Sequence, residues 1–229
     1  MKIGAIQKTS LIEFPNILSC IIFTQGCNFR CPYCHNPELV LPEKFGEIIP
    51  EEEIFDFLNR RKKYLEGVCI TGGEPSIQPD IIDFVKKVKN MGFKVKFDTN
   101  GSRPEIIEKL LKEGLVDYIA MDLKGPLEKY KMITGVEVET EKILKSIDII
   151  KNSKIDYEFR TTVVKKQICI DDFEKIGKII EGCKKYFLQK FIPSKLVEED
   201  FIKEKTYTDD EFENIKTIMK KYVVFCEVR

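Results

Sequence analysis

Short apolar runs alternate with longer amphipathic stretches along the chain, which is the pattern of a parallel sheet with crossover helices. Pro50, Pro79 and Pro104 stand at or just before the expected helix starts, and Gly92 and Gly114 stand where helices should stop. We expect strands over Leu18–Thr24, Val68–Thr71, Phe93–Asp98, Tyr118–Asp122, Tyr157–Val164 and Phe187–Ile192. The expected helices cover Pro50–Tyr64, Pro79–Met91, Pro104–Glu113, Glu139–Lys151 and Asp171–Cys183.

Six such strands suffice for a curved, open sheet. The predicted fold is therefore α/β, a partial (β/α)6 TIM-type barrel with a parallel curved sheet and short terminal additions. No composition shift and no linker rich in Ser or Pro divides the sequence, so we expect one domain over residues 1–229 with a core of about 16–195. The C-terminal addition, about 206–229, is a helix over Asp209–Lys221 and a strand over Val223–Val228.

Charge and composition exclude several classes of partner. The 229 residues include 38 Lys and Arg against 38 Asp and Glu, so no net positive field attracts a polyphosphate, and we expect no nucleic-acid partner. The apolar stretch Ile17–Phe23 is far shorter than the roughly 20 residues of a membrane span, and we expect no signal peptide before it. Eight cysteines without a secretory signal indicate the reducing cytoplasm, where thiols stay free or bind metals.

The residues that suggest chemistry follow four successive strands. They are the cysteine loop over residues 25–37, then Gly72–Pro75, Asp98–Gly101 and Asp122–Lys124. Ligands of parallel α/β folds gather at the carboxyl ends of the strands, because the loops there vary without disturbing the sheet. We therefore expect the four loops to converge on one face and form a single site.

The cysteine loop reads QGCNFRCPYCHNP and places thiols at Cys27, Cys31 and Cys34. Three thiolates so spaced can reach one soft metal centre, and an iron–sulfur cluster accounts for all of them. A redox pair of Cys31 and Cys34 would leave Cys27 unexplained, and covalent haem at Cys31–His35 would need an exported chain. A zinc site would require the adjacent Cys34 and His35 to ligate one tetrahedral ion. A four-iron cluster with three cysteine ligands keeps one iron open to a substrate.

The motif CNFRCPYC resembles the CxxxCxxC signature of the radical S-adenosylmethionine (SAM) superfamily, which has an aromatic residue before the third cysteine. The flanking FTQGC and HNP resemble the activating enzymes of glycyl radical proteins, above all those of anaerobic ribonucleotide reductase and pyruvate formate-lyase. The resemblance runs from Leu11 to about Ile192, is strong through Lys124 and weakens beyond Arg160. It implies a 4Fe-4S cluster held by the three loop cysteines, with SAM at the open iron.

The segment Val68–Pro75, VCITGGEP, ends a strand in two glycines, whose missing side chains let a ligand approach the main chain closely. A turn explains the glycines but not Glu74. By resemblance, Gly72, Gly73, Glu74 and Pro75 form the element that holds the methionyl amino group of SAM. Glu74 would accept a charge-assisted hydrogen bond from that ammonium.

The segment Phe97–Gly101, FDTNG, has the composition of a plain turn before the helix at Pro104. The resemblance to the pyruvate formate-lyase activating enzyme implies instead that it lies near the SAM carboxylate, with Asn100 as an additional contact and with Lys124 facing the carboxylate. The same resemblance implies a monovalent cation held by Asp98, Thr99, Met121 and Asp122. This oxygen-rich set suits a hard ion, although Met121 could offer only its backbone carbonyl.

Three further features complete the expected site. Tyr33, between two cluster cysteines, is implied to lie against the adenine, while we assign Phe29 and Arg30 to loop packing and local electrostatics. Arg160 is a charge within a strand that should be mostly buried, so it needs a partner, either a structural ion pair or SAM or a peptide. The scattered cysteines are expected to be small buried hydrophobes without a second cluster: Cys20, Cys69, Cys169, Cys183 and Cys226.

One departure from the related enzymes stands out. The only histidine is His35, whereas the pyruvate formate-lyase activator has a cofactor-contacting histidine after its sixth strand. The corresponding region, Phe191–Lys195, reads FIPSK and leaves open what replaces that contact.

The resemblance implies reductive cleavage of SAM to a 5′-deoxyadenosyl radical, which removes hydrogen from a glycine Cα of a glycyl radical enzyme. The implied partners are such an enzyme, with anaerobic ribonucleotide reductase as the expected one, and a low-potential electron donor such as flavodoxin or ferredoxin. Two alternatives stay open. One is a radical SAM enzyme acting on a small molecule in cofactor or modified-base synthesis. The other is a non-catalytic zinc or thiol-redox module, which would leave GGEP unexplained.

Overall fold

The computed structural model describes residues 1–193 and 199–229. Its strands form a single sheet in chain order, in which the first strand is antiparallel to the second and all later neighbours are parallel. The strands are β1 (Ile3–Ser10), β2 (Ser19–Thr24), β3 (Gly67–Gly72), β4 (Lys94–Thr99), β5 (Tyr118–Asp122), β6 (Asp156–Val163), β7 (Lys185–Lys190) and β8 (Phe225–Val228).

Helices connect each parallel strand to the next. The longer ones carry acidic residues in the first turn and basic residues in the last, which complements the helix dipole. The α-helices are α1 (Pro37–Val40), α2 (Glu51–Arg61), α3 (Ile81–Asn90), α4 (Pro104–Lys112), α5 (Tyr130–Thr134), α6 (Thr140–Lys151), α7 (Asp172–Ile179) and α8 (Asp209–Met219). Short 3-10 helices are η1 (Pro42–Lys44), η2 (Pro75–Ile77), η3 (Leu127–Lys129) and η4 (Glu199–Lys203).

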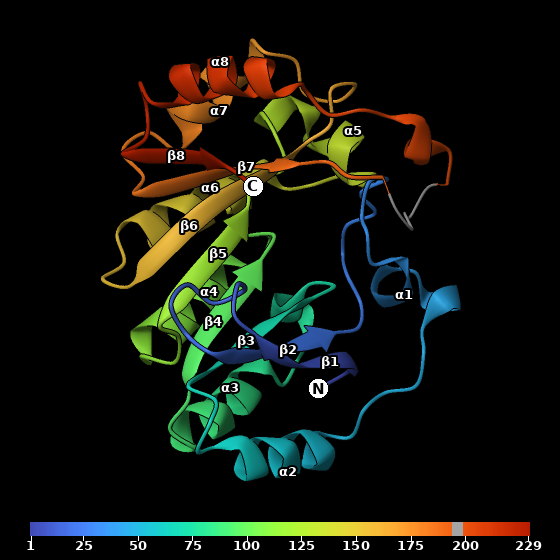
Figure 1. Ribbon diagram of the computed structural model, residues 1–229, viewed down its shortest axis with the longest axis vertical. Coiled ribbons are helices and arrows are strands. Elements are labelled where there is room, and N and C mark those ends of the chain that lie inside the picture. Colours follow the sequence, from blue (N-terminus) through green and yellow to red (C-terminus); the bar gives the residue numbers. More distant parts are fainter. Residues whose placement is uncertain (194–198) are drawn as a thin grey trace.

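Figure 1 shows a strongly curved sheet that runs from β1 and β2 through β5 to β7 and β8. Helices α2 and α3 lie beside the first parallel strands, and α7 and α8 cover the last ones. The two edge strands, β1 and β8, do not pair with each other, so the barrel is incomplete. The predicted α/β partial barrel with a parallel curved sheet is confirmed.

The ends of the chain differ from the prediction in detail. β1 was not predicted, because the three consecutive polar residues Gln7, Lys8 and Thr9, all exposed in the structure, break the alternation expected of a half-buried strand. The expected C-terminal strand is present as β8, and it extends the main sheet by pairing with β7. The helix expected to reach Cys183 ends at Ile179, and Gly182 then turns the chain with a positive φ of 77°.

The loop between β1 and β2 folds into the barrel at the amino ends of the parallel strands. Phe14 is buried there against Tyr118 and Ala120 in a small cluster apart from the main core, with ring centroids of Phe14 and Tyr118 6.1 Å apart. Gly67 allows this packing, because a Cβ at that position would lie 2.7 Å from Ile17 and 3.0 Å from Phe14. The chain's own loop therefore fills this end of the barrel, opposite the end where the parallel strands terminate.

No helix within the described residues has the length and apolar character needed to cross a bilayer.

Candidate active site

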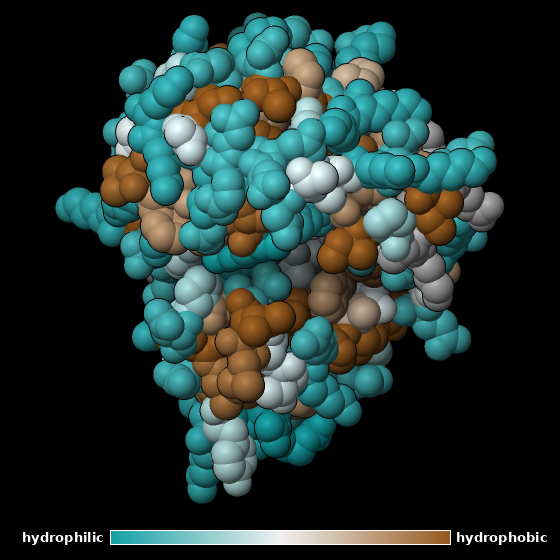
Figure 2. All heavy atoms as spheres, turned by 45° about the horizontal axis from the view of Figure 1, so that its top comes forward, coloured by the Kyte–Doolittle hydropathy of each residue, from teal (hydrophilic) through white to brown (hydrophobic). Residues whose placement is uncertain are grey.

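A cavity of about 400 Å³ lies where the four sequence-predicted loops meet. It also extends along the inner faces of β1, β2, β6 and β7, where Gln7, Phe23, Thr162 and Gln189 line it. In Figure 2 the molecule is hollowed near its middle, where hydrophilic residues meet a group of hydrophobic ones. The lining includes all but one of the predicted site residues: Cys27, Cys31, Tyr33, Cys34, Gly72, Gly73, Glu74, Pro75, Asp98, Thr99, Asn100, Asp122, Lys124 and Arg160. The exception is Met121, which is fully buried behind the cavity wall.

Main-chain hydrogen bonds hold the cysteine loop in place. Gly26 N donates to Leu39 O at 2.7 Å, and Arg30 N donates to Thr134 O of α5 at 2.7 Å. The Arg30 guanidinium donates to the carbonyl oxygens of Cys27 and Phe29, each at 2.7 Å. This confirms the assignment of Arg30 to the loop's own packing, and it shows that bonds within the polypeptide define the shape of the loop.

The three loop thiols face the same cavity and form no disulfide. Burial raises the pKa of Cys27 to about 12 and that of Cys31 to about 11, so the thiols keep their protons until a metal displaces them. The Phe29 amide donates to Cys27 Sγ at 3.3 Å, a bond that also suits a metal-bound thiolate. Three soft donors on one wall fit three irons of a cluster. His35, the fourth donor that a zinc site would need, has one of its two ring nitrogens, Nε2, 2.6 Å from Ile192 O.

Two glycines bring the loop after β3 against the cysteine loop. A Cβ at Gly73 would lie 2.0 Å from Gly26 O, and Gly72 has a φ of 112°, which side chains rarely adopt. Glu74 N donates to that same Gly26 oxygen at 2.8 Å. Gly73 therefore serves the contact between two loops, and Gly72 a close approach to Thr24 at the end of β2. Close approach of a ligand to these glycines, which also line the cavity, stays a prediction.

Glu74 is 1% exposed, and its carboxylate is held by neighbours from two loops. Its Oε1 accepts hydrogen bonds from Ser76 N at 3.1 Å, from the Ser76 hydroxyl, and from Thr99 Oγ1 at 2.7 Å. Its Oε2 accepts one bond, from Asn100 N at 2.6 Å. Burial raises the pKa of Glu74 despite these donors. Oε2 has capacity for a second donor, and a cation there would offset the burial of the charge.

A short chain of polar groups links the loop after β4 to the cysteine loop. Asn100 Nδ2 donates to Asn28 Oδ1 at 2.9 Å, and Asn28 Nδ2 donates to Ser102 Oγ at 2.8 Å. The sequence analysis gave Asn100 as a cofactor contact and did not find Asn28 or Ser102. Ser102 lies two residues after Asn100, whereas Asn28 is distant in sequence and only the fold brings it to Asn100.

Arg160 pairs with two carboxylates at the ends of neighbouring strands. Its Nε donates to Asp122 Oδ1 at 2.8 Å, and both terminal nitrogens lie 3.2 Å from Asp98 Oδ2. The structural ion pair left open by the sequence is therefore present. Since Arg160 also lines the cavity, a contact with SAM or peptide stays a prediction.

Comparison with known proteins identifies the family. The sequence matches the radical SAM superfamily over residues 21–179, more than half of the chain. The chain belongs to the radical SAM superfamily.

This radical SAM chain is similar to several proteins named as activating enzymes. A protein of Methanocaldococcus jannaschii is 39% identical over 96% of this chain and 92% of its own length. Its name assigns it provisionally to the glycyl-radical enzyme activating enzymes. The pyruvate formate-lyase-activating enzyme of Clostridium pasteurianum is 35% identical over 58% of this chain and 57% of its own. The crystal structure of a domain of the Bacteroides vulgatus pyruvate-formate lyase-activating enzyme has a TM-score of 0.58 at 18% identity, over 71% of this chain and 98% of that one, and shows the shared fold.

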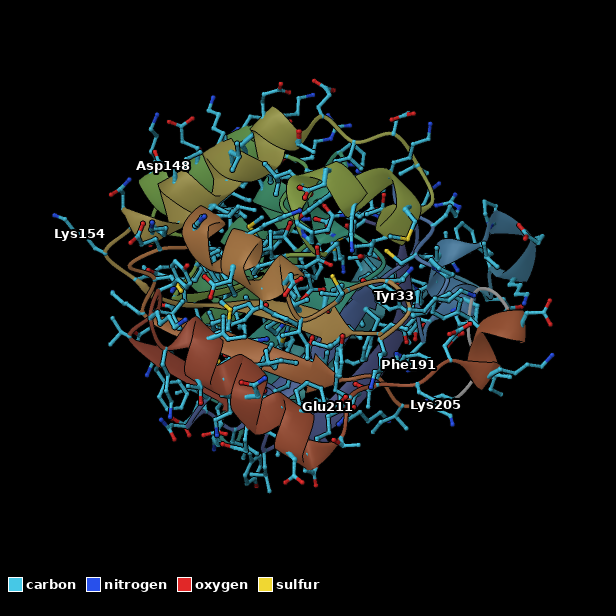
Figure 3. The ribbon with its side chains drawn as sticks, turned by 90° about the horizontal axis from the view of Figure 1, so that it is seen from above. Tyr33, Asp148, Lys154, Phe191, Lys205 and Glu211 are labelled. Carbon is cyan, nitrogen blue, oxygen red and sulfur yellow. The ribbon has the colours of Figure 1, made fainter. Side chains whose placement is uncertain are left out.

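Members of the radical SAM superfamily use a 4Fe-4S cluster and SAM, and these are therefore the cofactors of this chain. Tyr33, which is 4% exposed, lines this cavity, and its hydroxyl finds no hydrogen-bond partner of good geometry within the described part of the chain. Figure 3 places Tyr33 and Phe191 on the opposite side of the view from Asp148 of α6 and Lys154 just after that helix. The aromatic side chain therefore lies at the end of the barrel where the cofactors are expected.

The remaining cysteines of this radical SAM protein fall into three settings. Cys20, Cys183 and Cys226 are buried, as predicted. Cys169 is exposed, so the prediction was wrong for it; it lies in the turn before α7, with Sγ 3.1 Å from Asp172 Oδ2. Cys69 is buried, but among charged groups rather than apolar ones.

Residues 194–198 lie outside the described part of the chain. Of the region after β7 where the related enzyme has its histidine, Phe191–Lys195, the structure therefore describes only residues 191–193. His35 itself approaches this region, because its ring lies 5.9 Å from that of Phe191 and its Nε2 is bonded to Ile192 O.

Proposed function

We propose that this radical SAM protein generates a glycyl radical on a partner enzyme, with an anaerobic ribonucleotide reductase as the expected target. One observation carries the proposal: the M. jannaschii relative named for glycyl-radical enzyme activation is similar over almost the whole length of both chains. A bound and reduced 4Fe-4S cluster would supply the electron for reductive cleavage of SAM, the chemistry that would lead to removal of hydrogen from the glycine Cα.

The chain's own residues bind and orient the cofactors. Cys27, Cys31 and Cys34 would ligate three irons, which leaves the fourth open to SAM. Glu74 Oε2, with its single bond from Asn100 N, would accept the methionyl ammonium. Lys124 would face the SAM carboxylate and Tyr33 the adenine, since both line the same cavity as the thiols.

The cavity continues from the thiols down the inner faces of the edge strands. Gln7 and Glu13 line it from the β1 side, and Thr162 and Gln189 line it from β6 and β7. Because β1 and β8 are unpaired edges, we propose that an extended glycine-bearing segment of the partner enters between them. Amide and hydroxyl side chains suit the main-chain groups of such a segment.

The wider setting follows from the same proposal. A low-potential flavodoxin or ferredoxin would reduce the cluster, and cytoplasmic chemistry of this kind agrees with eight cysteines that form no disulfide. The expectation of no nucleic-acid partner still rests on the balanced charge.

The decisive experiment reconstitutes the protein with iron and sulfide without oxygen, adds reductant and SAM, and quantifies 5′-deoxyadenosine with and without a candidate glycyl radical enzyme. We expect a brown protein, product formation, and a glycyl radical signal on the partner by electron paramagnetic resonance. Product without any glycyl radical would favour the small-molecule alternative. A colourless protein with zinc and no product would contradict radical SAM chemistry.

A further inference from the structure

The cation site implied by resemblance can be tested against the side chains that would form it. Its acidic members, Asp98 and Asp122, lie at the ends of β4 and β5. A monovalent cation needs oxygen atoms that are not already bound to other positive groups.

All four carboxylate oxygens of these two residues already accept hydrogen bonds from basic side chains. Asp98 Oδ1 lies 2.5 Å from Lys96 Nζ, and Asp98 Oδ2 lies 3.2 Å from Arg160 NH1. Asp122 Oδ1 lies 2.8 Å from Arg160 Nε, and Asp122 Oδ2 lies 3.1 Å from Lys124 Nζ. Burial opposes ionisation of both acids, but these basic neighbours outweigh it and lower the pKa of each.

Of the two neutral members, Thr99 has its hydroxyl engaged, and Met121 lies within the sheet between β4 and β6. Thr99 Oγ1 donates to Glu74 Oε1 at 2.7 Å and accepts from Gly101 N at 3.1 Å. Met121 is paired with Thr99 on one side and Phe159 on the other within the sheet, and its side chain packs against Gly101, where a Cβ would lie 2.1 Å from Met121 Cε. The residues therefore do not fit a bound monovalent cation.

Lys96 supplies a positive charge to Asp98, one of the two acidic members of the expected cation set. It is 1% exposed, and its ammonium lies 2.8 Å from Glu13 Oε1, 2.5 Å from Asp98 Oδ1 and 3.7 Å from Cys69 Sγ. These three partner atoms lie within 4.8 Å of one another, close enough to surround one metal ion. A buried amine is stable only when its charge is matched, and here it is matched by the carboxylates.

The charges of this cluster balance within the chain itself. A fourth acid at its edge, Glu158, lies 4.0 Å from Arg160 and is paired with Arg229. An extra cation would therefore add an unmatched positive charge to a mostly buried region. Three basic side chains, Lys96, Lys124 and Arg160, face three acidic ones, Glu13, Asp98 and Asp122.

We propose that Lys96 is a built-in cation: it positions Asp98, and through it Arg160, in place of a sodium or potassium ion, so that this chain binds SAM without a monovalent metal. Lys96 does not line the cavity, so it is a positioning residue and not a catalytic one. The expected effect on SAM binding rests on the SAM site proposed above. The expected independence from a monovalent ion does not, because it is a property of the chain alone.

The first test therefore uses no radical chemistry. The thermal midpoint of the full chain is measured in potassium, sodium or tetramethylammonium chloride at equal ionic strength, because tetramethylammonium is too large for such a site. We expect midpoints equal within about 1 °C, whereas an ion present at 100 times its Kd would raise the midpoint by about 5–10 °C. A rise of that size specific to potassium or sodium would overturn the proposal even if the protein proved inactive.

The second test measures SAM affinity of the cluster-loaded protein in the same three salts. The wild-type Kd should agree within about twofold across them. Lys96→Met keeps most of the side-chain volume and removes the charge; it should weaken SAM binding about tenfold in tetramethylammonium, and potassium should restore part of the loss.

The matched control is Lys89→Met, because Lys89 pairs with Asp117 outside the cavity and should show no salt-specific change. If Lys96→Met binds SAM as well as wild type in every salt, or loses affinity without any recovery in potassium or sodium, the proposal is wrong. If Lys96→Met does not fold, the wild-type comparison across salts still decides it.

Discussion

At the scale of single residues, the same amino acid has different roles according to its neighbours. The spacing of Cys27, Cys31 and Cys34 predicts a metal centre, and all three thiols line the cavity. Cys169 has no other cysteine at such a spacing, and it lies exposed in a turn. The role of Lys96 was not predicted, because a lysine within a strand normally faces solvent. In the structure its ammonium is buried and bonded to Glu13, a residue distant in sequence.

We predict that Cys27→Ala prevents formation of a complete cluster and abolishes 5′-deoxyadenosine production, because two thiolates cannot hold the third iron. Iron and sulfide content, absorbance and product yield measure the effect. Cys169→Ala is the control and should retain wild-type iron content. Full activity of Cys27→Ala would show that Cys27 is not a cluster ligand. Loss of iron in Cys169→Ala would show that Cys169 was wrongly placed among the cysteines that do not bind the cluster.

Glu74 offers a second residue-scale prediction. Glu74→Gln removes the negative charge that would bind the methionyl ammonium and places a neutral amide group beside Asn100 N. The SAM affinity should therefore fall tenfold or more, which corresponds to about 1.4 kcal/mol or above. Equilibrium binding to the cluster-loaded protein measures it. Glu38→Gln, at an exposed position in α1 close to the cysteine loop, should bind SAM normally. Equal affinity of the two variants would remove Glu74 from the SAM site.

At the scale of elements, the site depends on how loops from different strands contact one another. The helices begin within about two residues of their predicted starts, because Pro104 and similar prolines mark first turns and Gly92 and Gly114 take the positive φ that ends a helix. The close contact between Gly73 and Gly26 could not be predicted, since it depends on the relative position of two loops.

We predict that Gly73→Ala disrupts the site. The new Cβ would meet the backbone oxygen of Gly26 at 2.0 Å, and backbone cannot move aside as a side chain can, so the two loops must separate. We expect a stability loss of about 1–3 kcal/mol together with reduced cluster content. Chemical unfolding and iron analysis would measure these effects. Gly46→Ala is the control, because nothing lies within 4 Å of the position that its new Cβ would take. Wild-type iron content in Gly73→Ala would contradict the role given to this contact.

At the scale of the whole molecule, the barrel is filled at one end and hollow at the other. Phe14 and its loop fill the end at the amino termini of the parallel strands, and the cavity opens among the loops at the other end. The order of strands, and hence the face that carries the site, could be predicted from the alternation of apolar runs. The inward-folding loop could not, because Leu11 and Ile12 beside Phe14 are exposed and the local pattern does not distinguish them.

We predict that Phe14→Ala lowers stability by about 3–5 kcal/mol, because it leaves a void against Tyr118 and Ala120. The thermal midpoint should fall by roughly 10 °C. Leu11→Ala, in the same loop but 78% exposed, should change stability by no more than about 0.5 kcal/mol. Similar losses in both variants would show that the loop does not fill the barrel in solution.

The hydrogen bonds from Gly26 to Leu39 and from Arg30 to Thr134 join parts of the polypeptide, so the cysteine loop takes its shape from the chain itself. The loop is thus fastened at two points, to α1 through Leu39 and to α5 through Thr134. The directions of its thiols therefore depend on two helices that are far apart in the sequence. A substitution that shifts α5 would move the metal ligands without changing any cysteine.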